Sequence, residues 1–291
     1  MAEISAAAVK SLRDGTGAGM MECKKALADA AGDVDRAVEL LRERGLAKAV
    51  KRAGRATSEG AIVLALVGSV AGIVELGCET DFVAKTDDFL AVANALARAA
   101  AEQAEAKTPD DLLAVKAGAR PLRELMQSAS GKLGENIELK RFARLAGAGA
   151  GQAGGYVHAG GRLGVIVALE TAAAGDGLGA LARDLAMHVA AHDPSPVSID
   201  RSGVPKELVA KEAELFRRQA QQEGKPAPVI ERIVEGRLKK YYAEVCLVEQ
   251  AFVKDPDRSV QQLLDEAGKA LGQPLRVTGF VRFRLGETTA E

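Results

Sequence analysis

The chain has 291 residues, of which 47% are hydrophobic, and this length and composition suit a globular protein with two domains or one elaborate domain. Lysine and arginine together number 39 against 40 aspartate and glutamate residues, so a net charge of −1 gives no general reason to expect a nucleic acid as partner. No run approaches the ~20 apolar residues of a membrane span, and Cys23, Cys78 and Cys246 form no metal-binding motif. We therefore expect a soluble, cytoplasmic protein with reduced thiols.

Residues 1–55 predict a small domain of three helices with a basic linker. The apolar positions at helical spacing are Ile4, Ala8, Val9 and Leu12, then Met20, Met21, Leu27 and Ala30, then Val34, Val38 and Leu41. Asp33 is a suitable N-cap for the third helix, and Gly45 is expected to end it. A module of this size should gain stability by docking onto a larger body.

Residues 45–60 carry four basic side chains, Lys48, Lys51, Arg52 and Arg55, with no acidic residue before Glu59. One interpretation is a basic patch that binds nucleic acid. The alternative is a solvated, partly helical linker, which we favour because the total charge is near zero and no aromatic residue is interleaved for base stacking.

Two segments of the chain repeat a β-β-α unit. Residues 61–80 and 154–173 each read as a strand, a glycine-containing turn and a second strand, and residues 71–74 match residues 163–166. The helices expected after them have the apolar positions Phe89, Val92, Leu96 and Ala100, and Leu178, Leu181, Leu185 and Val189. We predict paired α+β subdomains over 56–147 and 148–203, each an antiparallel sheet covered by helices on one face.

The remaining patterns predict one more helix and strand between the repeats and three helices and a strand after them. A helix is expected over 110–130 and a strand over 135–147. Helices over 206–222 and 229–245 are separated by glycine and proline, which predicts a protruding antiparallel hairpin over 204–245. Its expected contacts place Leu208, Leu215 and Phe216 against Ile233, Leu238 and Tyr241. Residues 246–291 should complete the second subdomain with a helix and an alternating strand that places Val277, Gly279, Val281, Phe283 and Leu285 on one face.

Three motifs resemble ligand sites but lack the context that such sites need. Residues 149–154 match G-x-G-x-x-G, yet a strand is expected to follow instead of a helix, so a flexible linker is the better interpretation. Residues 15–25 resemble a phosphate loop without its G-K-[ST] sequence. His188 and His192 have the spacing of zinc ligands without a third ligand, so a histidine that packs or contacts a partner is favoured.

Four carboxylates, Glu79, Asp81, Asp87 and Asp88, surround the aromatic Phe82 just after a predicted strand. Grouped carboxylates can hold Mg²⁺ or act as general acids and bases, so a Mg²⁺-dependent enzyme is one alternative. Asp87 and Asp88 stand where a helix should begin, and acids there cap backbone amides. Asp81 and Phe82 have no such explanation, because a turn after a strand usually presents its residues outward.

Five stretches of the sequence closely resemble the elongation factor Ts family, and the similarity runs in order along essentially the whole chain. They are GTGAGMMECKKAL (15–27), ETDFVAKTDDF (79–89), GENI (134–137), AMHVAA (186–191) and VEGRLKK (234–240). The resemblance implies a factor that is not an enzyme and that promotes release of GDP from elongation factor Tu. The partner would be elongation factor Tu, GDP-bound or nucleotide-free, with no cofactor, nucleic acid or membrane involved.

The resemblance also implies roles for particular residues. The exchange turn, defined as Thr80, Asp81, Phe82 and Val83, would insert into the partner and dislocate its Mg²⁺, and further contacts would come from Met20, Lys24, Leu133, Gly134, His188 and Val253. The family commonly has isoleucine where this chain has Leu133. The three helices would resemble a ubiquitin-associated (UBA) domain, and residues 206–245 would form the family's coiled-coil hairpin.

Overall fold

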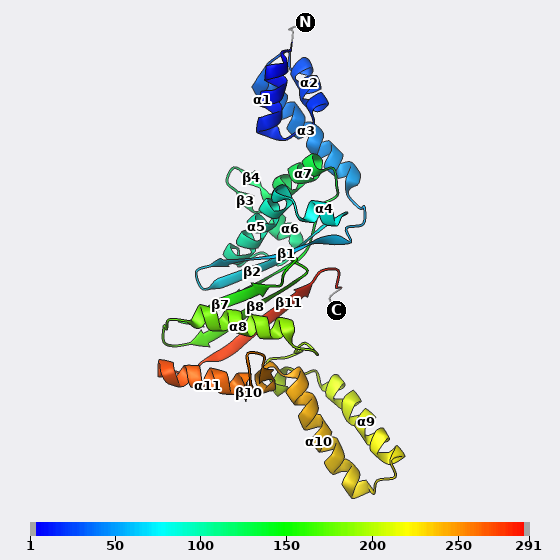
Figure 1. The fold of residues 1–291 in the computed structure, drawn as a ribbon, viewed down its shortest axis with the longest axis vertical. Coiled ribbons are helices and arrows are strands. Elements are labelled where there is room, and N and C mark those ends of the chain that lie inside the picture. Colours follow the sequence, from blue (N-terminus) through cyan, green and yellow to red (C-terminus); the bar gives the residue numbers. More distant parts are fainter. Residues whose placement is uncertain (1–3, 288–291) are drawn as a thin grey trace.

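A computed structural model describes residues 4–287 as a mixture of helices and small sheets, which confirms the α+β prediction (Figure 1). The helices are α1 (Ala6–Thr16), α2 (Met20–Asp29), α3 (Val34–Arg52), α4 (Asp81–Ala84), α5 (Asp87–Glu102), α6 (Pro109–Ala114), α7 (Leu122–Leu133), α8 (Leu178–Ala191), α9 (Lys206–Gln222), α10 (Ala227–Val245) and α11 (Val260–Leu271), with single 3-10 turns at Arg201–Gly203 and Leu247–Glu249. The strands are β1 (Glu59–Val67), β2 (Val70–Cys78), β3 (Lys116–Ala117), β4 (Arg120–Pro121), β5 (Glu138–Ala146), β6 (Ala148–Gly149), β7 (Ala153–Val157), β8 (Leu163–Thr171), β9 (Ala251–Phe252), β10 (Asp255–Ser259) and β11 (Arg276–Arg284).

The first β-β-α unit builds an antiparallel sheet in the order β1-β2-β5. One face of this sheet is covered by α5, whose Phe89 and Leu96 are fully buried together with Leu76 of β2 and Leu122 of α7. These side chains belong to one core, because the apolar stripe of α5 meets the apolar face of the strands.

The second β-β-α unit builds a sheet centred on β8, which pairs antiparallel with both β7 and β11. Its outer face is covered by α8 and α11 through buried residues such as Leu185 and Leu264. The prediction of a wholly antiparallel sheet is wrong in one detail, since the two-residue strand β6 pairs parallel with β8.

The two sheets pack face to face through the sides that their helices leave open. Ile62 and Ile73 of the first sheet lie in one apolar cluster with Ile166 and Phe283 of the second. Buried Glu75 adds a polar link, because it pairs with Arg141 at 2.7 Å and Arg141 donates to the carbonyl of Arg284 at 2.9 Å. The body therefore has four layers, with helices outside and sheets inside (Figure 1).

Strand β11 departs from the strict alternation that its sequence predicts. A bulge at Thr278 inserts one extra residue between the pairs Val277–Leu169 and Gly279–Ala168. Val277 consequently joins the core under α8 and α11, while Val281 and Phe283 face the first sheet. The sequence prediction that placed all of these on one face is therefore wrong for Val277.

Two helix boundaries also differ from expectation. Helix α3 continues through Gly45 to Arg52, so most of the basic stretch is helical. Residues 110–130 are not one helix, because the β3–β4 hairpin and its turn at Gly118, with φ of +67°, separate α6 from α7. In the N-terminal helices Met21, Val34 and Val38 are exposed, and Cys23, Ala26 and Ala37 fill the core instead.

Helices α9 and α10 form an antiparallel hairpin that projects from the body at the end opposite the N-terminal helices (Figure 1). Phe216, Ile233 and Leu238 pack together as predicted. Tyr241 lies in a separate cluster near the base, and Leu208 and Leu215 are exposed. The expected contacts of those two leucines are wrong, because Val209, Ala213 and Ala220 occupy the inner face of α9.

Candidate functional site

The exchange turn presents an aromatic side chain to solvent. Phe82 is 80% exposed. The turn is a single helical turn, α4, that follows β2 and precedes α5 (Figure 1). A phenylalanine so placed contributes little to its own core and is available to another molecule.

The local sequence explains why Phe82 points outward. Thr80 is the N-cap of α4, and its hydroxyl accepts from the amide of Val83 at 3.4 Å. Val83 packs against the first core and Ala84 is buried within it, so one side of this short helix is anchored. Thr86 closes the segment by donating its hydroxyl to the carbonyl of Val83 at 2.8 Å. The remaining side carries Asp81 and Phe82.

A carboxylate from the other end of the subdomain fixes the start of the turn. Glu135 accepts the backbone N–H groups of Glu79 and Thr80, both at 3.0 Å, and the hydroxyl of Thr80 at 2.6 Å. In return the carboxylate of Glu79 accepts the N–H of Asn136 at 2.7 Å. This reciprocal arrangement was not predicted, since 55 residues of chain separate Thr80 from Glu135.

The carboxylates singled out in the sequence do not converge on one point. Glu79 turns inward to Asn136, whereas Asp81 pairs with Lys85 at 2.7 Å on the surface. Asp88 lies in the first turn of α5 and pairs with Lys132 at 2.8 Å. Residues 4–287 hold no group of three or more metal-ligating side chains that could bind one ion.

Asp81 carries a full negative charge near neutral pH. The ammonium group of Lys85, one helical turn later, lowers the pKa of Asp81 below its usual value through a hydrogen bond. Lys85 is itself highly exposed, so a partner can displace this ion pair at small cost. The turn thus offers an ionised carboxylate beside an apolar ring.

A groove of about 750 Å³ lies beside the exchange turn. Its lining includes residues 59–64 of strand β1 together with Asp81 and Leu90. The turn between β7 and β8 also lines the groove, through Gly160, Gly161 and Arg162. His158 in this turn is exposed, a surface position that the sequence prediction did not single out.

Leu133 and Gly134 lie close to the exchange turn because they directly precede Glu135, whose carboxylate accepts the hydrogen bonds from Glu79 and Thr80. Leu133 ends α7 and packs partly against the first core. Gly134 is exposed and ends the helix with φ of +82°, a conformation that favours glycine. The structure therefore brings these two predicted contacts together with Thr80.

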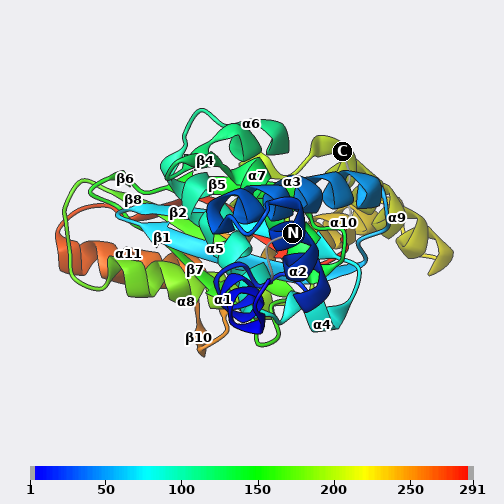
Figure 2. The ribbon, with the colours of Figure 1, turned by 90° about the horizontal axis from the view of Figure 1, so that it is seen from above.

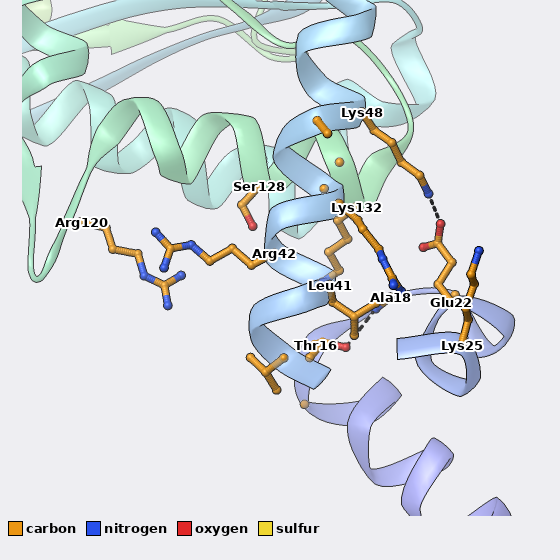
Figure 3. Close-up of a pocket in the computed structure, with 17 residues that line it drawn as sticks. Thr16, Ala18, Glu22, Lys25, Leu41, Arg42, Lys48, Arg120, Ser128 and Lys132 are labelled. Carbon is orange, nitrogen blue, oxygen red and sulfur yellow. Dashed lines mark hydrogen bonds and ion pairs between the residues drawn. The ribbon is translucent and has the colours of Figure 1, made fainter. Parts of the chain in front are cut away.

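Met20 and Lys24 lie on a different part of the molecule, in α2. Both side chains are exposed, and Met20 is 52% accessible. Among the N-terminal helices, α3 packs against α7, and the view from above shows α3 crossing over it (Figure 2). A second cavity of about 630 Å³ is lined by residues of α2, α3, α7 and the loop before α2 (Figure 3). Its charged lining residues are mostly basic: Lys25, Arg42, Arg44, Lys48, Arg120 and Lys132, with Glu22 as the acidic one.

His188 is fully buried, so it offers no surface to a partner in this conformation. Its Nε2 lies 3.0 Å from the amide oxygen of Gln250, and its Nδ1 accepts the N–H of Val253 at 3.1 Å. Val253 is 44% exposed in the turn between β9 and β10. Of the two alternatives drawn from the sequence, His188 packs, and it positions the backbone of Val253.

The glycine-rich motif at residues 149–154 is part of the second sheet. Gly149 is in β6, and a β-carbon at Gly151 would stand 2.0 Å from the carbonyl oxygen of Leu169. Strand β7 follows, as expected, so there is no helix N-terminus to hold a pyrophosphate. The expectation of a flexible linker is wrong, because these glycines permit close backbone packing.

Two general expectations can be compared with the described residues. Within residues 4–287 no helix is both long and apolar enough to cross a membrane. Cys23, Cys78 and Cys246 are buried free thiols, and burial raises the pKa of Cys78 to about 12 and that of Cys246 to about 11.

Comparison with known proteins gives consistent matches along the chain. The family model described as Elongation factor TS matches residues 79–287. Elongation factor Ts of Clostridium perfringens is 43% identical over 98% of this chain and 93% of its own length. The same factor is 47% identical in Thioalkalivibrio sulfidiphilus, over 98% of this chain and 92% of the relative, and 46% identical in Prosthecochloris aestuarii, over 98% and 100%.

Proposed function

Because the chain belongs to the elongation factor Ts family of translation elongation factors, we propose that it is a guanine nucleotide exchange factor that promotes GDP release from elongation factor Tu. It acts by protein–protein contact and not as an enzyme. Elongation factor Tu is its partner in both GDP-bound and nucleotide-free forms, and the site of action is the cytoplasm.

The observation that carries this proposal is the 80% exposure of Phe82 on a backbone that is fixed from both sides. A rigid aromatic side chain inserts into a gap between helices at low entropic cost, and such an anchor is typically worth ~2 kcal/mol or more. A flexible loop would lose part of this energy on becoming ordered.

Exchange follows from a coupling between two ligands of one GTPase. GDP with its Mg²⁺ stabilises one arrangement of the nucleotide-binding loops, and the exchange turn binds better to another arrangement. Each ligand therefore weakens the affinity of the other by the same factor. No covalent step is needed, because acceleration arises from binding energy alone.

Asp81 supplies the electrostatic part of the proposal. Its lowered pKa keeps the carboxylate ionised, and its surface ion pair with Lys85 is readily exchanged. Placed near a bound Mg²⁺, this charge competes for the water molecules and side chains that support the metal. Loss of Mg²⁺ leaves the phosphates of GDP poorly neutralised, which favours their departure.

The remaining contacts extend the interface along the molecule. Met20 and Lys24 are assigned to the GTPase domain of the partner, and Leu133 and Gly134 to the region beside the exchange turn. Val253 forms a contact on the second subdomain, with His188 behind it as support. The N-terminal helices act as a UBA-like domain and the α9–α10 hairpin as a coiled coil.

The test is release of a fluorescent GDP analogue from preloaded elongation factor Tu, measured with increasing amounts of this protein. We expect a saturable increase in the release rate and no consumption of nucleotide. If micromolar protein leaves the release rate at its spontaneous value, the proposed function is wrong. An excess of unlabelled GDP should occupy the nucleotide-free partner and prevent rebinding of the fluorescent analogue. The fluorescence change then reports the release rate.

A further inference from the structure

Helix α7 lies between the two surface regions that the proposed function assigns to the partner. One side of the helix supports the N-terminal helices, which carry Met20 and Lys24 (Figure 2). Its C-terminal end runs directly into Glu135, which clasps the exchange turn. The same twelve-residue helix therefore contacts both regions.

The contact with the N-terminal helices is close at one pair of glycines. A β-carbon at Gly131 of α7 would stand 2.9 Å from both the Cα and the carbonyl oxygen of Gly45 in α3, too close for the backbones to stay where they are. A β-carbon at Gly45 would meet no atom within 4 Å. The approach of the two helices thus depends on Gly131 and not on Gly45.

Polar contacts fix the rotation of α3 on α7 around this point. Arg42 pairs with Glu124 near the start of α7. Arg52 donates to the carbonyl of Ser130 at 3.2 Å near its end. These contacts lie near opposite ends of α7 and define the direction in which α3 crosses it.

Lys132 connects the same helix to both regions at once. Its stem lies over Gly17, where a β-carbon would be 2.2 Å from the Lys132 Cε, and its ammonium group pairs with Asp88 at 2.8 Å. Gly17 belongs to the loop before α2. Asp88 lies in the first helical turn of α5, the helix that follows the exchange turn. The lysine therefore bridges the loop before Met20 and the helix after Phe82.

The C-terminal end of α7 is tied to the exchange turn by a short chain of hydrogen bonds. Ser130 donates its hydroxyl to the carbonyl of Glu135 at 2.6 Å. Glu135 in turn accepts the amide and the hydroxyl of Thr80. Ser130 is thus linked both to Arg52 of α3 and, through Glu135, to the exchange turn.

We propose that α7 is a rigid spacer that holds Met20 and Lys24 at a fixed distance from Phe82, so that both regions engage one molecule of the partner together. This inference rests on the proposed function. When two contact regions lie on one rigid body, formation of the first contact gives the second a high effective concentration, which raises the affinity. This gain in affinity is lost when the spacing of the two regions no longer matches the partner. Residues that touch no partner, Gly131 above all, then control affinity.

The decisive variant is Gly131→Ala in the full chain, with Gly45→Ala as matched control from the same helix contact. Gly131→Ala should displace α3 and raise the concentration that gives half-maximal GDP release by about tenfold or more. Gly45→Ala should leave that concentration unchanged. Spin labels at Lys10→Cys and Ala91→Cys report the displacement directly, because Cys23, Cys78 and Cys246 are buried.

A second background separates spacing from simple loss of structure. In a Met20→Ala, Lys24→Ala protein the N-terminal contact is already removed, so Gly131→Ala should have little further effect. If Gly131→Ala raises the half-maximal concentration as much in that background as in the unmodified protein, the spacer inference is overturned. It is also overturned if the spin labels show a displaced α3 while the half-maximal concentration stays unchanged. If the label distance stays unchanged in Gly131→Ala and in the bulkier Gly131→Leu, the glycine contact does not set the spacing and the inference is also wrong.

The failure of the proposed function has a different signature. In that case the unmodified protein fails to accelerate GDP release from elongation factor Tu, or the Phe82→Ala variant accelerates it as much as the unmodified protein does. If the Phe82→Ala variant accelerates GDP release only weakly and the Gly131→Ala variant accelerates it as well as the unmodified protein, only the spacer inference fails.

Discussion

The carboxylate of Glu135 holds Thr80 through both of its oxygens, with one accepting the Thr80 hydroxyl at 2.6 Å and the other its backbone N–H at 3.0 Å. The second oxygen also accepts the N–H of Glu79. Three donors on one carboxylate fix the entry into α4, and the orientation of Phe82 follows from that entry.

Glu135→Gln should loosen the exchange turn without unfolding the protein. A carboxamide keeps one acceptor oxygen and places an NH₂ group against donors, which costs about 1–2 kcal/mol locally. We expect amide hydrogen exchange at Glu79 and Thr80 to accelerate by about tenfold, the factor that ~1.4 kcal/mol corresponds to. Glu138→Gln is the control, because Glu138 binds Thr57 and Lys140 instead. If the amides of Glu79 and Thr80 are equally protected from hydrogen exchange in both variants, Glu135 does not restrain the exchange turn.

Phe82→Ala should change function and leave stability almost intact. Since Phe82 is exposed, the free energy of unfolding should change by no more than about 0.5 kcal/mol. Loss of the anchor should reduce GDP release at subsaturating protein by about thirtyfold, which corresponds to ~2 kcal/mol. Urea unfolding and fluorescent GDP release measure the two effects. Phe89→Ala is the contrasting variant, because Phe89 is fully buried and its truncation should cost about 3–5 kcal/mol.

The stability of the second subdomain should depend on the protonation of His188. Burial lowers the pKa of His188 below 6.5, with a further contribution from the neighbouring His192. The unfolded chain therefore binds a proton more readily, so the native state loses stability as the pH falls below ~6.5 and regains it above that value. His188→Gln should lose less stability than the unmodified protein between pH 7.5 and 5.5. Chemical unfolding at these two pH values measures the difference, and parallel curves would rule out His188 as the titrating group.

Gly45→Ala should stabilise the N-terminal helices. Gly45 lies inside α3 and has open space where a β-carbon would be. Alanine is favoured over glycine in a helix interior by about 0.5–1 kcal/mol. Thermal unfolding should therefore move to higher temperature. A decrease would show that α3 needs a backbone freedom which the observed helix does not explain.

The sequence predicted those parts of the fold that repeat over short distances. The two β-β-α units, the stripe of α5 and the hairpin helices follow from periodicities that any window of about ten residues displays. The exposure of Phe82 was also predictable, because an aromatic residue after a strand and beside acidic residues has no place in the core below it. Recognition of the family rests on the same continuous stretches.

Contacts between distant segments could not be predicted in this way. Gly45 looked like a helix terminator, yet α3 continues through it to reach α7. Strand β11 looked regular, yet Thr278 forms a bulge whose effect on Val277 depends on the pairing with β8. For His188 the sequence left packing and partner contact as alternatives, and only the fold shows that it is buried with Gln250 and Val253 at its two nitrogens.

The sequence by itself determined the class of fold and the family, and it located the turn to which we assign the exchange role, because these reside in local patterns and continuous motifs. Only the tertiary structure decided how that turn is held and how far it stands from the N-terminal helices. Glu135 and Gly131 act through partners 55 and 86 residues away in the chain, and no local signal marks such pairs. Their roles arise from the way α7 packs, which is a property of the assembled fold.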